Sequence, residues 1–392
     1  MIMRIIIAIQ ISMASSLFTS SSMAASNDEL RERFPVSLDR LRDRANQALG
    51  EDLVVVTDKP DPPPGGSLHD YWSLSPYHWP DPNSDGGMPY INRDGEVNPE
   101  SESERFDRLR LFKMSDVLRA CSLGYSAMRD ERYAECAARW VRAWFIVHET
   151  RMNPSLDFAQ HIPGKTAGSP AGIIRGMIFL EVNECLQHLS GSPHWTEEDT
   201  KGWKAWTAAY LDWLLTSELG QLEEKAFNNH GTWHDVQVST FALLHGREEL
   251  VRQRLALAKS RRIQRQIKPD GRQPLELMRT KSWDYSVMNL LGMARLAECG
   301  MPLGEKLWEF ETPQGAGMRK ALDYLLPFAL GEEIWTGKQI RDFDGRSLYP
   351  VVHAAARALG DARYDAAMAK LGGDHAANLE ENLRDRLHES KP

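Results

Sequence analysis

The chain has 392 residues, of which 42% are hydrophobic and 26% are charged, which is ordinary for a soluble globular protein. Its formal net charge is −8, so nothing suggests the basic face that nucleic acid requires, and nucleic acid is excluded as an expected partner. An acidic polymer would instead need a local group of cationic side chains.

The first residues are typical of an export signal. Arg4 precedes an apolar run, and Ser22, Met23 and Ala24 match a small-x-small cleavage site. The apolar run is too short to span a bilayer comfortably, although an uncleaved anchor is the alternative interpretation. We therefore expect residues 1–24 to be a removable signal peptide. The mature protein should then be periplasmic or secreted, with no contact with the membrane after cleavage.

Residues 60–102 are rich in Pro, Gly, Asp and aromatic residues. Pro and Gly break helices and set turns, whereas aromatic side chains such as Tyr77, Trp79 and Tyr90 argue against disorder. We predict an ordered, extended, loop-rich segment that wraps a helical body. It either packs over an edge of that body or forms one wall of a sugar-binding groove.

From about residue 103 onward, apolar residues recur at helical spacing. No long strands with a period of two alternate with these stretches, so a doubly wound sheet is not expected. The predicted helices lie within residues 103–128, 132–148, 171–189, 197–219, 234–245, 250–267, 285–299, 318–330 and 351–359, and in the C-terminal tail.

Three segments, residues 127–140, 244–257 and 358–371, share a weak internal repeat. Each ends one helix, turns through polar residues and begins another helix. Such hairpins stack side by side and bury a continuous core. The repeat predicts an all-α chain of helix hairpins over residues 25–392, as one domain. It does not choose between an open solenoid and a closed toroid.

The four cysteines are Cys121, Cys136, Cys185 and Cys299, and no C-x-x-C pair occurs among them. Neither a zinc knuckle nor a redox motif is therefore indicated. Export makes disulfides possible, and Cys121 and Cys136 lie symmetrically about a predicted helix turn. Four buried free thiols remain the default expectation.

Two segments carry the most informative chemistry. "NNHGTWHD" (228–235) places two amides and an imidazole at an expected helix start, and "QPLELMRTKSWDYS" (273–286) places Arg279 six residues before Tyr285. A nearby guanidinium favours the phenolate form of Tyr285. The amide of Asn229 can donate to a carboxylate, and His230 can take a proton near neutral pH. Such a set could hold an acid and move its α-proton.

Four segments, in this order, resemble the alginate lyase superfamily of polysaccharide lyases. They are "SLSPYHWPDP...GMPYINRDGEVNPE", "NPSLDFAQHIPG", "NNHGTWHDVQ" and "PDGRQPLELMRTKSWDYS". The resemblance spans roughly residues 65 to 300. It is closest to the branch that holds mannuronate-specific alginate lyases and glucuronan lyases (polysaccharide lyase family thirty-eight), and it is looser to family five.

This resemblance implies an (α/α) toroid and β-elimination at a uronate, with no metal or other cofactor. It implies an acidic polysaccharide substrate, and we expect a monomer. Asn229 and His230 correspond to the family's Asn-His pair, and Arg279 and Tyr285 to its Arg and Tyr. Gln160 falls in a segment that lines the cleft in such folds. The other expected substrate contacts are Asn228, Tyr77, Trp79, Trp233 and His234.

The chemistry of elimination assigns roles to these residues. Removal of the C5 proton of a uronate pushes charge onto its carboxylate, which Asn229 and Arg279 would stabilise. In mannuronate and glucuronate, H5 and O4 lie on the same side, so Tyr285 could serve as base and then as acid. His230 would assist by binding the carboxylate or by keeping Tyr285 deprotonated. In guluronate, His230 would be the base and Tyr285 the acid.

Several alternatives stay open at this stage. Asn229 could be a helix N-cap, and His230 with His234 could bind zinc on one helix face. Trp203, Trp206 and Trp213 could stack on sugars or lie in the core. A glycoside hydrolase would use two carboxylates from the set Glu276, Asp284 and Asp235. A catalytically silent glycan-binding protein would bind polyuronate without forming an unsaturated product.

Overall fold

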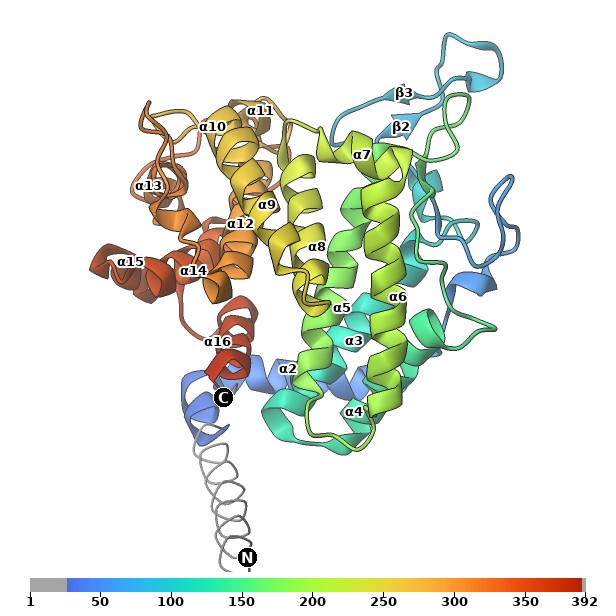
Figure 1. The fold of residues 1–392 in the computed structure, drawn as a ribbon, viewed down its shortest axis with the longest axis horizontal. Coiled ribbons are helices and arrows are strands. Elements are labelled where there is room, and N and C mark those ends of the chain that lie inside the picture. Colours follow the sequence, from blue (N-terminus) through green and yellow to red (C-terminus); the bar gives the residue numbers. More distant parts are fainter. Residues whose placement is uncertain (1–26, 390–392) are drawn as a thin grey trace, which may run out of the picture.

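The computed structural model describes residues 27–389, which form a mainly helical protein (Figure 1). The α-helices are α2 (Pro35–Leu49), α3 (Arg108–Met128), α4 (Glu131–Val141), α5 (Met177–His188), α6 (Glu197–Thr216), α7 (Glu218–Glu224), α8 (Asn229–Leu244), α9 (Glu248–Leu257), α10 (Gln264–Gln266), α11 (Pro274–Leu277), α12 (Ser282–Gly300), α13 (Met318–Ala329), α14 (Tyr349–Leu359), α15 (Ala362–Leu371) and α16 (Ala376–Glu389). The strands are β1 (Trp72–Leu74), β2 (His78–Trp79), β3 (Ile91–Asn92) and β4 (Phe158–His161).

The three repeat segments form the hairpins α3–α4, α8–α9 and α14–α15, as their sequences predict. Two of these hairpins turn in the same way. Arg129 and Gly360 adopt the left-handed conformation at the end of the first helix, and an aspartate follows each of them. The side chains of Asp130 and Asp361 then cap the second helix by accepting a backbone N–H.

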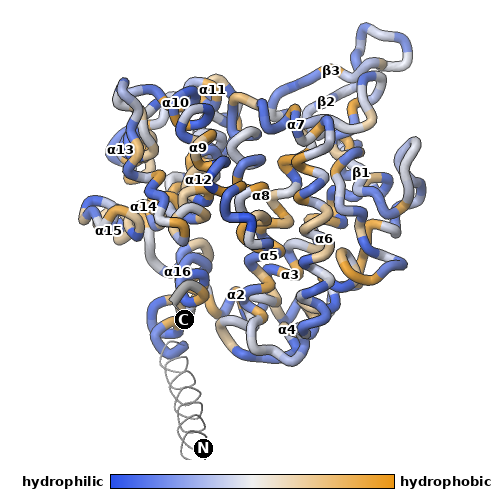
Figure 2. The backbone as a smooth tube through the Cα atoms, in the orientation of Figure 1, coloured by the Kyte–Doolittle hydropathy of each residue, from blue (hydrophilic) through white to orange (hydrophobic). Residues whose placement is uncertain are grey.

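Most residues of helix α8 are buried, and the helix lies between α6 and α12. Figure 2 shows the hydrophobic character of this central part of the chain. Trp203 and Trp206 of α6 are 2% and 5% exposed, and they stack on each other with ring centroids 5.7 Å apart. The tryptophans of α6 therefore contribute mainly to the core, and Trp213 is tied to Asp157 by a hydrogen bond of 3.0 Å.

The inner helices contact one another in a series that returns to its start. Contacts run from α2 to α3, α5, α8, α12, α14 and α16, and α16 contacts α2. In Figure 1 the chain's last helix accordingly lies close to α2. This arrangement leaves a space between the inner helices, and the candidate site lies there.

Residues 60–102 are attached to the helical body at several points. Strand β1 pairs in parallel with β4, and β2 pairs with β3 to form a hairpin. The backbone N–H of Trp72 donates to Asp107, a buried carboxylate that also pairs with Lys59 at 3.0 Å. Trp72 and Tyr90 pack together with Phe106 in a separate small apolar cluster.

The sequence also predicts a signal peptide and buried free cysteines. The predicted signal peptide lies outside the described residues. Within residues 27–389, no helix combines the length and apolar character needed to cross a membrane. The four cysteines are buried free thiols, which is the default expectation from the sequence.

Candidate active site

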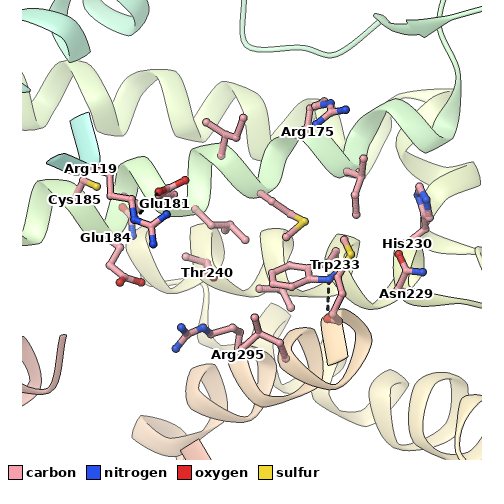
Figure 3. Close-up of a pocket in the computed structure, with 18 of the residues that line it drawn as sticks. Arg119, Arg175, Glu181, Glu184, Cys185, Asn229, His230, Trp233, Thr240 and Arg295 are labelled. Carbon is pink, nitrogen blue, oxygen red and sulfur yellow. Dashed lines mark hydrogen bonds and ion pairs between the residues drawn. The ribbon is translucent and has the colours of Figure 1, made fainter. Parts of the chain in front are cut away.

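A cavity of about 1700 Å³ lies among the inner helices. Seven of the ten predicted site residues line it: Tyr77, Gln160, Asn229, His230, Trp233, Arg279 and Tyr285. Figure 3 shows Asn229 and His230 toward one end of this space and Arg119 and Glu184 toward the other. Arg279 and Tyr285 contact each other and line the same cavity, so the predicted catalytic residues are brought to one cavity from separate segments.

Asn229 is held by a buried carboxylate. Its backbone N–H and its side-chain amide Nδ2 donate to the two oxygens of Glu276, each at 2.7 Å. Burial raises the pKa of Glu276, which is 1% exposed, although the two bonds from Asn229 oppose that rise. The start of α8 therefore faces an anion, as a helix N-terminus favours, and that anion is a protein side chain.

Capping does not explain the two asparagines. Asn228 occupies the N-cap position, but its side chain accepts no capping hydrogen bond. Asn229 is already inside the helix, and its Oδ1 atom is buried with no hydrogen-bond partner among the described residues. One N–H of its Nδ2 remains for a ligand once Glu276 has taken the other.

His230 is oriented by Glu223 of α7. Its Nδ1 atom lies 2.6 Å from Oε1 of Glu223, whose side chain is 4% exposed. This contact leaves Nε2 as the ring nitrogen available to a ligand. His230 itself is partly exposed and lines the cavity.

Arg279 forms a two-point ion pair with Asp94, which follows the β2–β3 hairpin. Its Nη2 donates to Oδ1 of Asp94 at 2.7 Å, and its Nε lies 3.2 Å from both carboxylate oxygens. The hydrogen bond from Arg279 lowers the pKa of Asp94 to about 2 despite partial burial. These hydrogen bonds use Nε and Nη2 of Arg279, so the two N–H groups of Nη1 remain available to a ligand. The guanidinium also lies 3.9 Å from the centre of the Tyr285 ring.

The hydroxyl of Tyr285 donates to the hydroxyl of Tyr77 at 3.4 Å, and Nζ of Lys281 donates to the same Tyr77 oxygen at 3.4 Å. Burial and this bond to Tyr77 raise the pKa of Tyr285. Burial would also raise the pKa of Tyr77, but the bond from Tyr285 and the charge of Lys281 lower it overall. The charge of Arg279 lowers the pKa of Tyr285, as the sequence predicts, but burial and the bond to Tyr77 outweigh it, so this pKa is raised overall.

Gln160 and Trp233 also line the cavity. Gln160 has a left-handed backbone (φ 51°), which is uncommon for a residue other than glycine. Its Nε2 donates to the backbone oxygen of Ala171 at 3.1 Å. Trp233 is 4% exposed, and its indole N–H donates to the backbone oxygen of Met288, so only a small part of its surface faces the cavity.

Three predicted contact residues lie elsewhere. His234 is fully buried (0% exposed), so the predicted substrate contact is wrong for this structure; α8 has no exposed face at that position. Trp79 lies on β2, where its ring is covered by Arg93 and its N–H donates to Glu96. Asn228 does not line the cavity.

The alternative chemistries find little support in this geometry. Of the three carboxylates that a hydrolase would use, none lines the cavity: Glu276 holds Asn229, Asp235 pairs with Arg262 at 2.8 Å, and Asp284 accepts from Gln339. Over the described part of the chain, no group of three or more His, Cys, Asp or Glu side chains could hold a metal ion.

The supporting residues Glu223, Asp94 and Lys281 were not identified from the sequence. Asp94 is 185 positions away from Arg279, and no local pattern links the two. Lys281 stands two residues after Arg279, inside a segment already identified, but a lysine at a helix start is ordinarily exposed. Its burial at 5% exposure is visible only in the structure.

Comparison with known proteins agrees with the resemblance in the sequence. A family model described as "Alginate lyase" matches residues 55–335. The chain is similar to the crystal structure of an alginate lyase from Bacteroides ovatus, with a TM-score of 0.83 and 31% sequence identity over 92% of this chain and 97% of that one. No curated protein sequence matches. The family match and the structural match together show that this chain belongs to the alginate lyase family, and that it is a polysaccharide lyase.

Proposed function

We propose that this lyase cleaves a β-1,4-linked polyuronate, either polymannuronate or glucuronan, and leaves a 4,5-unsaturated uronate at the new end. The family implies β-elimination on a polyuronate. The single observation that carries the finer proposal is the pair of hydroxyls of Tyr285 and Tyr77, 3.4 Å apart, in the cavity that Asn229 and His230 also line. One phenol of this pair can act on both H5 and O4 when they lie on the same side of the sugar.

Asn229 and Arg279 neutralise the uronate carboxylate in this proposal. The free N–H of Asn229 Nδ2 and the Nη1 donors of Arg279 point to a carboxylate held between them. Their partners Glu276 and Asp94 fix both side chains before the substrate binds, so little reorganisation accompanies the reaction. His230, fixed through Nδ1 by Glu223, adds a contact from Nε2.

The two tyrosines move the proton. With Tyr77 ionised, Tyr285 passes its hydroxyl proton to Tyr77, and the resulting Tyr285 phenolate removes H5. The electron pair of the C5–H bond forms the C4=C5 double bond as the C4–O4 bond breaks, and Tyr285 returns its proton to O4. Tyr77 then returns its proton to Tyr285. The ammonium of Lys281 beside Tyr77 stabilises the starting phenolate.

Several finer properties belong to the same proposal. The returning series of helix contacts and the central cavity support an (α/α) toroid. The order of the sequence segments supports the mannuronate and glucuronan branch, polysaccharide lyase family thirty-eight. We further propose an exported, monomeric enzyme that needs no cofactor.

A substrate panel tests this proposal. Polymannuronate, polyguluronate, glucuronan and neutral β-1,4-glucan are each incubated with the purified enzyme, and the unsaturated product is followed by its ultraviolet absorbance. We expect the highest kcat/KM on polymannuronate or glucuronan and no product from the neutral glucan. A clear preference for polyguluronate would overturn the proposed use of one phenol for both proton transfers.

A further inference from the structure

Arg175 stands out among the charged residues of the cavity. It lies in the 3₁₀ turn η5 (Pro170–Gly176) and lines the same cavity as Asn229, His230 and Tyr285. Within residues 27–389, its guanidinium has no carboxylate partner and no hydrogen bond. It lies 5.1 Å from the centroid of the Phe112 ring, and its charge also interacts electrostatically with Tyr71 and Arg108. Burying part of a cation without an anion is costly unless a ligand supplies that anion.

The other cavity arginines differ from Arg175 in this respect. Each of them has a carboxylate partner. The pairs are Arg119 with Glu181 and Glu380, Arg279 with Asp94, Arg295 with Glu298 and Glu381, and Arg384 with Glu184 and Glu298. Arg175 therefore contributes a positive charge that the cavity wall does not neutralise.

The position of Arg175 is fixed by the elements around it. The side chain of Gln160 donates to the backbone oxygen of Ala171 at 3.1 Å, and that of Gln237 in α8 donates to the oxygen of Ile173 at 3.1 Å. The next residue, Gly176, packs so closely that an added Cβ would lie 1.8 Å from Oε1 of Gln237. The turn is clamped between β4 and α8, so Arg175 is presented from a rigid base.

The Phe112 ring holds the guanidinium while leaving its N–H edges free. Arg108 covers the same ring, 5.4 Å from its centroid, but is neutralised by Glu102 at 2.9 Å. In Figure 3, Arg175 comes from the wall opposite Trp233, toward the end that holds Asn229 and His230.

We propose that Arg175 binds the carboxylate of a second uronate residue of the polymer, next to the one that is cleaved. This assignment rests on the proposed function. The planar guanidinium can bind a carboxylate through two parallel hydrogen bonds. Because the contact is to a residue whose bonds do not change, it stabilises the bound substrate and the transition state equally and acts on KM more than on kcat.

The test uses Arg175→Gln, which removes the charge, and Arg175→Lys, which keeps the charge but loses the planar fork. Arg132→Gln is the matched control, because Arg132 is exposed on α4, away from the cavity lining, and pairs with Asp130. kcat and KM are measured on oligouronates of increasing length, starting from the shortest one that the wild-type enzyme cleaves. For the longer oligosaccharides, we expect Arg175→Gln to raise KM about ten-fold or more with kcat within about two-fold. The KM of Arg175→Lys should lie between those of the wild type and Arg175→Gln, and the KM of the control should match that of the wild type.

A KM that stays unchanged at every length would overturn the assignment. A fall in kcat without a rise in KM would also overturn it, because Arg175 would then act at the reacting uronate or on the fold. Binding of the same oligosaccharides to Tyr285→Phe and to Tyr285→Phe/Arg175→Gln gives an independent readout by calorimetry, with an expected ten-fold or greater increase in Kd. If the proposed function itself is wrong, the wild-type enzyme will form no unsaturated product from mannuronate or glucuronate polymers. That result is distinct from a failure of the Arg175 assignment alone.

Discussion

Asn229 shows how one side chain can be tested for catalysis against a structural role. Its amide bridges Glu276 and the cavity, whereas the preceding Asn228 holds the N-cap position without a capping bond. Asn229→Ala should lower kcat by roughly 10²-fold, by analogy with the loss of an oxyanion-hole donor. Asn228→Ala is the matched control and should leave kcat nearly unchanged. Near-normal kcat in Asn229→Ala, with only a lower Tm, would mean that this amide merely supports the helix.

The charge of Lys281 should affect the pH dependence of activity. The pKa of Tyr77 is lowered because Tyr285 donates to it and because the Lys281 ammonium is close. If Tyr77 must be ionised, activity rises with pH through that lowered pKa. Lys281→Met removes the charge and raises the pKa of Tyr77, so the rise should move to higher pH by on the order of one unit. Lys281→Arg should keep it near the wild-type position. A pH profile that stays the same in Lys281→Met would exclude this role.

The ion pair between Asp94 and Arg279 connects the β2–β3 hairpin to the segment before α12. The pKa of Asp94 is about 2 in the folded protein against an ordinary value of 3.8. A carboxyl whose folded pKa is lowered adds stability that is present above about pH 4 and is lost as the pH falls toward 2. The difference corresponds to at most about 2 kcal/mol.

Asp94→Asn should therefore lower the free energy of unfolding near neutral pH by an amount of this order, and the loss should shrink as the pH falls below 4. Because Tyr77 lies at the base of the same hairpin, kcat should fall as well. Denaturant unfolding at several pH values checks the first part. A destabilisation that is equally large at pH 3 and pH 7 would show that the charge of Asp94 is not its cause.

Helix hairpins could be predicted from the sequence because each depends on local spacing and on turn residues such as Asp130 and Gly360. The strands could not, because they are two to four residues long and are set by contacts with distant segments. His234 was misassigned for a related reason. One helical turn after His230, it would share an exposed face on an amphipathic helix, but most of α8 is buried and His234 is 0% exposed.

The proposed catalytic residues could be selected from the sequence because the motifs contain the reactive side chains themselves, whereas the residues that orient them are far away in the chain. Glu276 is 47 positions from Asn229, and no periodicity links them. The position of Arg175 in the cavity, without an anion, depends on the packing of η5 against α8 and is likewise invisible in one sequence.

The first residues of the chain predict that the protein is exported. Arg4, the apolar run and the small residues up to Ala24 indicate a signal peptide. Protein isolated from its native envelope should have lost about two dozen residues. Intact-mass measurement checks this, and a mature chain that still begins at Met1 would contradict it.

In the described part of the chain, a partly buried pair of phenols, two fixed donors and the Arg175 guanidinium line the same cavity. In the proposed mechanism, Tyr285 transfers the protons of the elimination. Tyr285→Phe keeps the ring beneath Arg279 and its packing but removes the transferable proton.

The most direct test of this role compares wild-type enzyme and Tyr285→Phe. kcat, with polymannuronate and glucuronan as substrates, and Tm are measured on the same preparations. We predict a loss of at least ~10²-fold in kcat, the lower end of general acid–base effects, with Tm nearly unchanged because the shape of the side chain is retained. A Tyr285→Phe enzyme that forms unsaturated product at a near-normal rate would contradict the proposed mechanism.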